Sequence, residues 1–176
     1  MKKMLMGTAA FCCMMISMMA MSACSSSDNS SPAVQALNTV ATVNVSADML
    51  KYLDVKVEWY DEAGQLKSES LRNQEWTQTV KVNVGTAATR GMKVSLKLRD
   101  DVLLDPEAKM NVDYSFLFTY ETYDEEGKPH TKMYDGMGSG SYNSEELEEW
   151  LAGTDSRFSC LVNYDTKGVA TRSEWK

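Results

Sequence analysis

The chain has 176 residues, a formal net charge of −7 at pH 7 and 4 cysteines. This length fits one domain that can bury its own core, together with a short leader. The acidic balance repels phosphate backbones and anionic lipid headgroups, so it argues against nucleic-acid binding and against a basic membrane-docking face.

Residues 1–23 are organised like a secretory signal peptide. A basic head at Lys2 and Lys3 precedes the apolar, uncharged stretch 4–20, and small residues follow it. This order is typical of a leader that is cleaved during export. The alternative is a transmembrane helix, but the apolar stretch lies at the short edge of the roughly 17–25 residues required, and no basic residue follows it as a stop signal.

The motif Met21-Ser22-Ala23-Cys24 resembles the lipobox of bacterial lipoproteins. The resemblance implies that the leader is removed, that Cys24 carries a lipid, and that the chain is anchored in the bacterial outer membrane on its periplasmic or cell-surface face. Two or three acyl chains on one cysteine would hold the protein firmly, since a single chain binds a membrane only marginally. Ordinary secretion with cleavage before Cys24 is the alternative.

Removal of this leader leaves 153 residues with a formal charge of −9, because two lysines and no acidic residue are lost. Cys160 is then the one cysteine beyond the anchor, so the mature chain has no partner for an intramolecular disulfide. Its place between Ser159 and Leu161, in an alternating apolar run, favours a small buried hydrophobe over a catalytic thiol.

Residues 24–37 are expected to form a flexible polar tether, and residues 38–176 a single domain. The tether has too few apolar residues to offset the entropy of ordering. Beyond it, apolar and polar residues alternate, which is typical of strands with one buried face. Strands of this kind are predicted at 38–45, 53–60, 65–71, 76–84, 92–99, 111–123, 128–137, 158–164 and 169–175.

Two helical segments interrupt the strand pattern. Ser46 can cap a short helical turn before the second strand. Later, Asn143 and Glu146 form a capping box that begins a helix over 144–152, and acidic residues in its first turn suit the helix dipole. Gly153 is expected to end this helix.

Two segments rich in small residues, Gly85–Gly91 and Gly136–Ser141, are expected to be flexible loops. Pro129 places the strand 128–137 at a sheet edge, because proline cannot donate to a ladder on both sides. The C-terminal strand 169–175 is the other candidate edge. An exposed edge can recruit a strand from a partner protein.

These patterns predict a mainly all-β fold, an antiparallel immunoglobulin-like β-sandwich of about eight or nine strands with one short helix near 144–152. The lipobox, the polar tether and the run Ser46–Val55 resemble small lipoproteins of gut Bacteroidetes that carry immunoglobulin-like sandwiches. The resemblance implies a location and a fold, not a reaction. Most such proteins have no assigned activity, some belong to glycan-uptake systems, and others belong to surface fimbriae.

The motifs of common enzyme classes do not occur in the sequence. There is no Gly-x-Ser-x-Gly, no His-Glu-x-x-His and no P-loop, and the one histidine is His130. Paired carboxylates could hydrolyse a glycoside, but most acidic residues fall in turns or on the solvent-facing side of strands. We therefore expect a non-catalytic binding or structural role without a cofactor, with a glycan or another envelope protein as the partner besides the membrane.

Two sets of side chains are candidates for binding a ligand. Aromatic residues outside the main core pattern could stack on sugars, although tyrosines at strand ends commonly pack with only the hydroxyl in water. They are Tyr60, Tyr123, Tyr134, Tyr142 and Trp175. Carboxylates in the loop 100–108 suit calcium but lack the EF-hand spacing, so a solvated acidic loop is favoured. They are Asp100, Asp101, Asp105 and Glu107.

Overall fold

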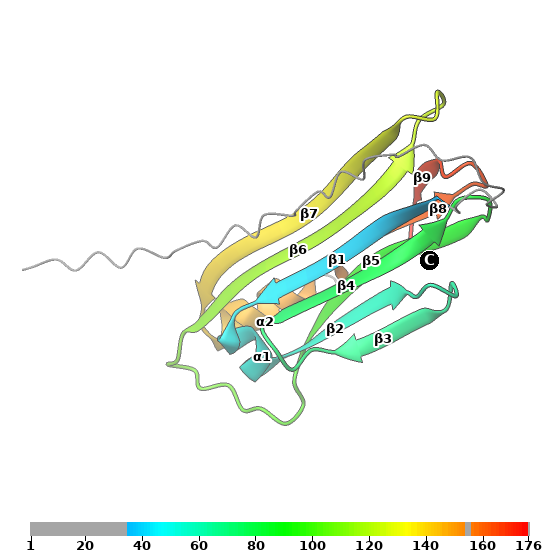
Figure 1. The fold of residues 1–176 in the computed structure, drawn as a ribbon. Helices are drawn as coiled ribbons and strands as arrows, with labels where there is room; N and C mark the ends of the chain where they lie inside the picture. Colours follow the sequence, from blue (N-terminus) through cyan, green and yellow to red (C-terminus); the bar gives the residue numbers. More distant parts are fainter. Residues whose placement is uncertain (1–34, 154–155, 176) are drawn as a thin grey trace, which may run out of the picture. The chain divides into compact units, whose positions relative to one another are not determined.

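Two antiparallel β-sheets pack face to face in this protein (Figure 1). The structure is a computed structural model that describes residues 35–153 and 156–175. The first sheet has the order β4 (Glu75–Asn83), β1 (Ala36–Val45), β6 (Met110–Tyr123), β7 (Pro129–Tyr142). The second has the order β3 (Leu66–Ser70), β2 (Leu53–Tyr60), β5 (Ala88–Leu98), β8 (Ser156–Tyr164), β9 (Ala170–Ser173). The predicted antiparallel β-sandwich of eight or nine strands is confirmed.

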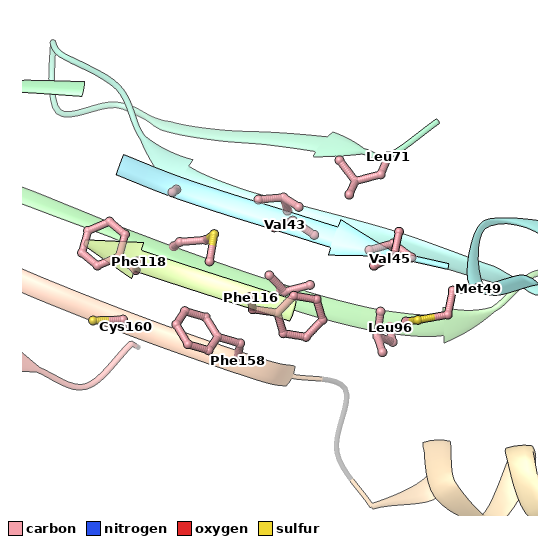
Figure 2. Close-up of a cluster of buried hydrophobic side chains, with 14 of the residues drawn as sticks. Val43, Val45, Met49, Leu71, Leu96, Phe116, Phe118, Phe158 and Cys160 are labelled. Carbon is pink, nitrogen blue, oxygen red and sulfur yellow. The ribbon is translucent and has the colours of Figure 1, made fainter. Parts of the chain in front are cut away.

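Alternate side chains of both sheets build the core, as the strand periodicity predicts. Val43, Val57 and Phe116 are each 0% exposed. Figure 2 shows members of this cluster, among them Phe118 and Phe158, filling the space between the sheets. Burying each such side chain contributes about 1.5–3 kcal/mol relative to leaving it in water. β1 begins at Ala36, two residues before its predicted start, because the next residue continues the buried face.

A second helix, besides the one predicted over 144–152, lies between β1 and β2. Helix α1 (Ala47–Tyr52) grows from the helical turn predicted after Ser46, whose Oγ accepts a 3.3 Å hydrogen bond from the amide of Met49. Met49 is 1% exposed and belongs to the core. The prediction of one helix is therefore an undercount, and burial of Met49 explains why a single capped turn is stable here.

Helix α2 (Ser144–Ala152) has the bounds that its capping box predicts. The side chain of Asn143 accepts a 2.9 Å bond from the amide of Glu146, and the Glu146 carboxylate accepts a 2.9 Å bond from the amide of Asn143. These two bonds satisfy donors that every helix N-terminus leaves free. Leu147 is the buried residue of the helix, which ends at Gly153.

The segment Gly85–Gly91 is not the loop that its composition suggested. β5 begins at Ala88, so Arg90 and Gly91 lie inside a strand. A side chain at Gly91 would run into the carbonyl oxygen of Cys160 on the neighbouring strand and into the ring of Trp175. Glycine is needed here for close packing between strands and not for chain flexibility.

The segment Gly136–Ser141 is likewise a strand and not a flexible loop. β7 continues to Tyr142 as the edge of the first sheet. Aromatic rings cover the inward side of its glycines: the ring of Tyr114 lies against Gly138, and the ring of Phe158 lies against Gly136. Each ring fills the volume that a side chain would occupy, which compensates for the poor strand propensity of glycine. The edge position predicted from Pro129 is confirmed.

Three turns with the pattern Asp-x-x-Gly gather at one end of the sandwich (Figure 1). They are Asp61–Gly64, Asp124–Gly127 and Asp165–Gly168. Their glycines have φ values of 75°, 79° and 81°, a region that other residues rarely adopt. β1 also begins at this end, whereas α1, α2 and the loop 99–109 lie at the other.

Candidate functional site

Two of the five predicted sugar-contacting aromatics meet on the outer face of the second sheet. The rings of Tyr60 and Trp175 are 5.5 Å apart between centroids and are inclined by 49°. Tyr60 is the last residue of β2, and Trp175 follows β9. Both side chains are partly exposed, so their rings are accessible from solvent.

Strand register explains why these distant residues meet. Tyr60 pairs with Leu66 of β3, and the pairing of β2 with β5 places Gly91 on the other side of Tyr60. Gly91 in turn pairs with Leu161 of β8. Because Gly91 has no side chain, the ring of Trp175 lies over it. We call this row across four strands, formed by Leu66, Tyr60, Leu161 and Trp175, the Tyr60–Trp175 platform.

Polar hollows lie on both sides of the platform. A groove of about 590 Å³ begins at Trp175, and its lining residues include serines and a glutamate. Its other lining residues are Ser159, Arg172, Ser173 and Glu174. A second hollow of about 330 Å³ begins at Tyr60. The polar residues that line it are Glu62, Asn83, Thr86, Thr89 and Arg90.

Arg90 fixes the wall of the second hollow. Its Nη2 donates to the carbonyl oxygens of Glu62 at 3.1 Å and Lys81 at 3.0 Å, and its Nη1 donates to that of Thr89 at 2.7 Å. The side chain is 4% exposed, and Nε has no partner within the described ranges. Burial lowers the pKa of this guanidinium, because removal from water disfavours the charged form. Its hydrogen bonds hold the turn after Tyr60 against β4.

Glu58 lies next to the platform along β2 and is already ion-paired. Its carboxylate oxygens are 3.1 Å from Nζ of Lys56 and 3.9 Å from Nζ of Lys93. All three side chains point to the outer face of the second sheet: Glu58 and Lys93 form the nearest pair to the platform row on that face, and Lys56 lies one such pair further along β2. This polar row can donate or accept hydrogen bonds beside an apolar surface.

Comparisons with protein-family models, curated proteins and solved structures give no match. The function is therefore argued from the surface chemistry of this chain alone. Cys24, the predicted leader and residues 24–34 of the predicted tether lie outside the described residues. Within the described part, neither helix is long and apolar enough to cross a membrane.

Tyr123 stands apart from the platform, between two hollows at the end that carries the three turns. These hollows measure about 600 and 330 Å³. The Tyr123 hydroxyl donates a 3.1 Å bond to the side-chain oxygen of Gln35. Beside it, Nε2 of His130 lies 2.7 Å from Oδ2 of Asp124. This hydrogen bond, together with the backbone amide of Lys128, lowers the pKa of the Asp124 carboxyl.

Tyr134 and Tyr142 pack against the sandwich instead of joining the platform. The ring of Tyr134 stacks on buried Tyr120 with centroids 6.0 Å apart, and the guanidinium of Arg172 covers it. The ring of Tyr142 stacks on Trp150 of α2 at 5.7 Å. Burial raises the pKa of Tyr120. Both rings cover the core side of β7, which matches the packing alternative for tyrosines at strand ends.

The four calcium candidates do not converge on one point. Asp100 pairs with Lys97 at 3.0 Å, and Asp101 pairs with Arg99 at 2.8 Å, which lowers the pKa of the Asp101 carboxyl. Asp105 accepts from the amide of Glu107. Among residues that the structure describes, no group of three or more His, Cys, Asp or Glu side chains could hold a metal ion. This arrangement favours the solvated acidic loop.

Cys160 is a buried hydrophobe, as its place in the alternating run predicts. It is 1% exposed, and burial raises the pKa of its thiol to about 11. The one histidine, His130, is engaged with Asp124 on an exposed turn. A thiol so rarely ionised is a poor nucleophile.

Proposed function

We propose that this chain is a lipid-anchored, non-catalytic protein of the bacterial envelope that binds a glycan on the Tyr60–Trp175 platform. The observation that carries the proposal is the contact of the two partly exposed rings, 5.5 Å apart, between two polar hollows. Ligand sites typically combine an apolar or aromatic surface with a few polar groups at its margin.

The platform has the dimensions of an extended ligand. It crosses four strands, and neighbouring strands lie about 4.8 Å apart, so its length is about 15 Å. The apolar faces of sugar rings can lie on Tyr60 and Trp175, while their hydroxyls reach the hollows on either side. This favours an oligosaccharide lying across the strands over a single sugar.

A binding role is preferred to a catalytic one because two charged groups beside the platform, Glu58 and Arg90, are already engaged. Glu58 lies between Lys56 and Lys93, and Arg90 donates to three carbonyl oxygens. A carboxylate that already lies between two lysine ammonium groups is less available to contact a substrate. Glycan binding needs an accessible aromatic surface with polar groups beside it, which the platform and its hollows provide.

The experiment is a screen of the purified chain, carrying Cys24→Ala to avoid lipidation, against a broad glycan panel. Each glycan that binds is then titrated into the Trp175→Ala variant and into the Tyr60→Ala variant. Each substitution should weaken binding at least about tenfold, as expected for a central aromatic contact. Tyr123→Ala is the matched control, because it removes a partly exposed tyrosine outside the platform, and it should change the affinity less than about twofold.

Two results would refute the glycan proposal. One is a panel in which nothing binds. The other is a glycan whose affinity depends on Tyr123 and not on Trp175. Anchoring is tested separately by fractionating cells: the unaltered chain should sediment with membranes, and Cys24→Ala should be released. A Cys24→Ala chain that stays in the membrane pellet would contradict the lipid anchor.

A further inference from the structure

We propose that the free edge of β7 accepts an extended segment of a partner protein as an additional strand. The segment carries apolar residues opposite Met133 and Met137 and a basic residue opposite Asp135. This inference rests on the first sheet and is independent of the glycan platform on the second. It concerns an interaction surface for a peptide strand.

The hydrogen-bonding pattern shows which backbone groups of β7 are free. The amide of Asp124 donates to the carbonyl of Lys128 at the start of the β6–β7 ladder. The register then runs without a shift to the pair Met110–Tyr142. Because bonded and non-bonded pairs alternate in an antiparallel ladder, even-numbered residues of β7 bond to β6. Odd-numbered residues from 131 to 141 therefore direct their amides and carbonyls outward.

The other edge of the same sheet is already occupied by side chains of this chain. By the same alternation, odd-numbered residues of β4 face outward, since the amide of Val84 bonds to the carbonyl of Gln35. Arg90 donates to the carbonyl of Lys81, and the Gln78 side chain donates to that of Thr79. Two outward carbonyl oxygens of β4 are thus already engaged, so this edge is less available to a partner strand than β7.

Both edges of the second sheet are short. β3 has 5 residues and β9 has 4, whereas β7 has 14. Lys67 and Glu69 pair with Trp59 and Val57, so charged side chains occupy the inward face of β3. Short edges and inward-pointing charges are devices that prevent strand addition. β7 is long, and from Tyr134 to Tyr142 its inward face carries aromatic rings and glycines; its inward charge, Lys132 opposite Tyr120, lies near the start of the strand.

The outer face of β7 defines the chemistry of the partner. Met133 is 62% exposed and Met137 is 70% exposed, which makes them two of the most exposed large hydrophobic residues in the described part of the chain. Asp135 lies between them on the same face and has no ion-pair partner among the described residues. An incoming strand would place alternate residues opposite these three, in the order apolar, basic, apolar.

Charge argues that the occupant is a foreign segment and not a second copy. Two copies paired antiparallel with Met133 opposite Met137 would place Asp135 opposite Asp135, and like charges in that position are destabilising. The predicted mature chain also carries a formal charge of −9, which makes copies repel each other and attract a basic segment. The order apolar, basic, apolar reads the same in both directions, so it fits a partner strand that runs either parallel or antiparallel to β7.

The probe is the peptide Ac-Thr-Val-Thr-Lys-Thr-Val-Thr-NH2, titrated into the isotopically labelled chain and followed by amide NMR. Shifts and slowed hydrogen exchange should appear at the amides of residues 133, 135 and 137 and not at even-numbered neighbours. The control peptide Ac-Thr-Thr-Val-Lys-Val-Thr-Thr-NH2 has the same composition and charge but places its valines out of phase. It should bind at least fivefold more weakly, and equal binding would overturn the proposal.

A matched pair of proline variants tests the edge itself. Met137→Pro removes an outward amide of β7, and Thr77→Pro removes an outward amide of β4; neither deletes a backbone hydrogen bond inside the sheet. Met137→Pro should abolish peptide binding, and Thr77→Pro should preserve it. Thermal unfolding of both variants checks that each is folded. Retained binding by folded Met137→Pro overturns the proposal.

A reversed charge at position 135 tests the proposal even if the proline variant does not fold. Asp135→Lys should weaken binding of the lysine peptide about two- to fivefold and should favour a peptide with glutamate in its place by a similar factor. If Asp135→Lys still prefers the lysine peptide to the glutamate peptide, the assigned register is wrong. Sedimentation of the unliganded chain completes the test: self-association that Asp135→Lys alters would assign the edge to a second copy and overturn the proposed partner.

Discussion

Arg90 and Lys81 join the two sheets through a single polar contact: Nη2 of Arg90 on β5 donates a 3.0 Å hydrogen bond to the carbonyl oxygen of Lys81 on β4. The same guanidinium group also holds the turn after β2 through the carbonyl of Glu62. A buried cation thus replaces apolar packing at the end of the sandwich that carries the platform.

Replacing Arg90 with methionine should destabilise the protein by about 2–4 kcal/mol, because several buried carbonyl oxygens lose a charged donor. Urea unfolding gives the change in free energy. Arg172→Met is the matched control: it removes an exposed guanidinium that covers the ring of Tyr134, and it should cost less than about 1 kcal/mol. Equal effects of the two substitutions would contradict the role assigned to Arg90.

Gly91→Ala should cost about 2–3 kcal/mol in unfolding free energy, because the added methyl group meets the backbone carbonyl of Cys160 and the ring of Trp175. Gly153→Ala is its counterpart at the end of α2, where φ is −74° and a methyl group meets open space. That substitution should be neutral or stabilising by up to about 1 kcal/mol. The denaturant midpoints of the two variants measure these effects. An unchanged midpoint for Gly91→Ala would contradict the close packing assigned to Gly91.

Asp124 should make stability depend on pH under acidic conditions. Its folded-state pKa lies below the ordinary value of 3.8, mainly because of the hydrogen bond with His130. The unfolded chain therefore binds more protons near pH 4, so this contribution is complete above the unfolded pKa and is lost as pH falls through the folded pKa. The stability advantage of the natural chain over Asp124→Asn should therefore be constant above about pH 5 and shrink as the pH falls below about 4.

The control for this pH series is Asp124→Asn made in a His130→Ala chain, which lacks the largest cause of the lowered pKa of Asp124. In that chain the stability difference should change less with pH than in the natural chain. The same pH dependence in both chains would contradict the role of the Asp124–His130 pair.

Cys160 should resist alkylation while the protein is folded. With a pKa of about 11, its thiol is ionised in about one molecule in a thousand at pH 8, and the side chain is 1% exposed. Peptide-level mass spectrometry should show labelling at least about a hundredfold slower in buffer than in concentrated urea. Comparable rates would indicate that β8 opens readily.

Local patterns were sufficient to predict the strands with strict alternation. β2 has the predicted bounds 53–60, because its apolar residues fall on one parity and a glycine turn follows. The capping box predicted α2 in the same way, since Asn143 and Glu146 satisfy each other within one turn. In both cases the decisive interactions lie within a few residues along the chain.

The wrong predictions share one physical cause. Gly85–Gly91 and Gly136–Ser141 look like loops because glycine has a low strand propensity. Their stability comes from distant groups: the carbonyl of Cys160 approaches Gly91, and the ring of Tyr114 covers Gly138. Interactions between residues so far apart in sequence cannot be recognised from either segment alone.

The platform was predictable only in part. The sequence identifies Tyr60 and Trp175 as aromatic residues outside the main core pattern, but their meeting depends on the pairing of β2 with β5 and of β5 with β8. Leu161 was missed for the same reason, although a glycine at an outward position beside Met92 is a sign of close approach. The exposed methionines of β7 lie within the predicted strand 128–137, but their exposure depends on the pairing of β7 with β6, which the strand's own sequence does not specify.

The start of β1 beside the three turns has a consequence for how far each surface can travel from a bilayer. Gln35 is 11 positions after Cys24 in the sequence, and a fully extended chain of that length spans at most about 40 Å. If Cys24 carries the proposed acyl group, this length is an upper limit on the distance between the lipid headgroups and the first described residue of the domain. The 14 residues of β7 span about 45 Å, so the helical end can reach at most about that much further, whichever way the domain is turned.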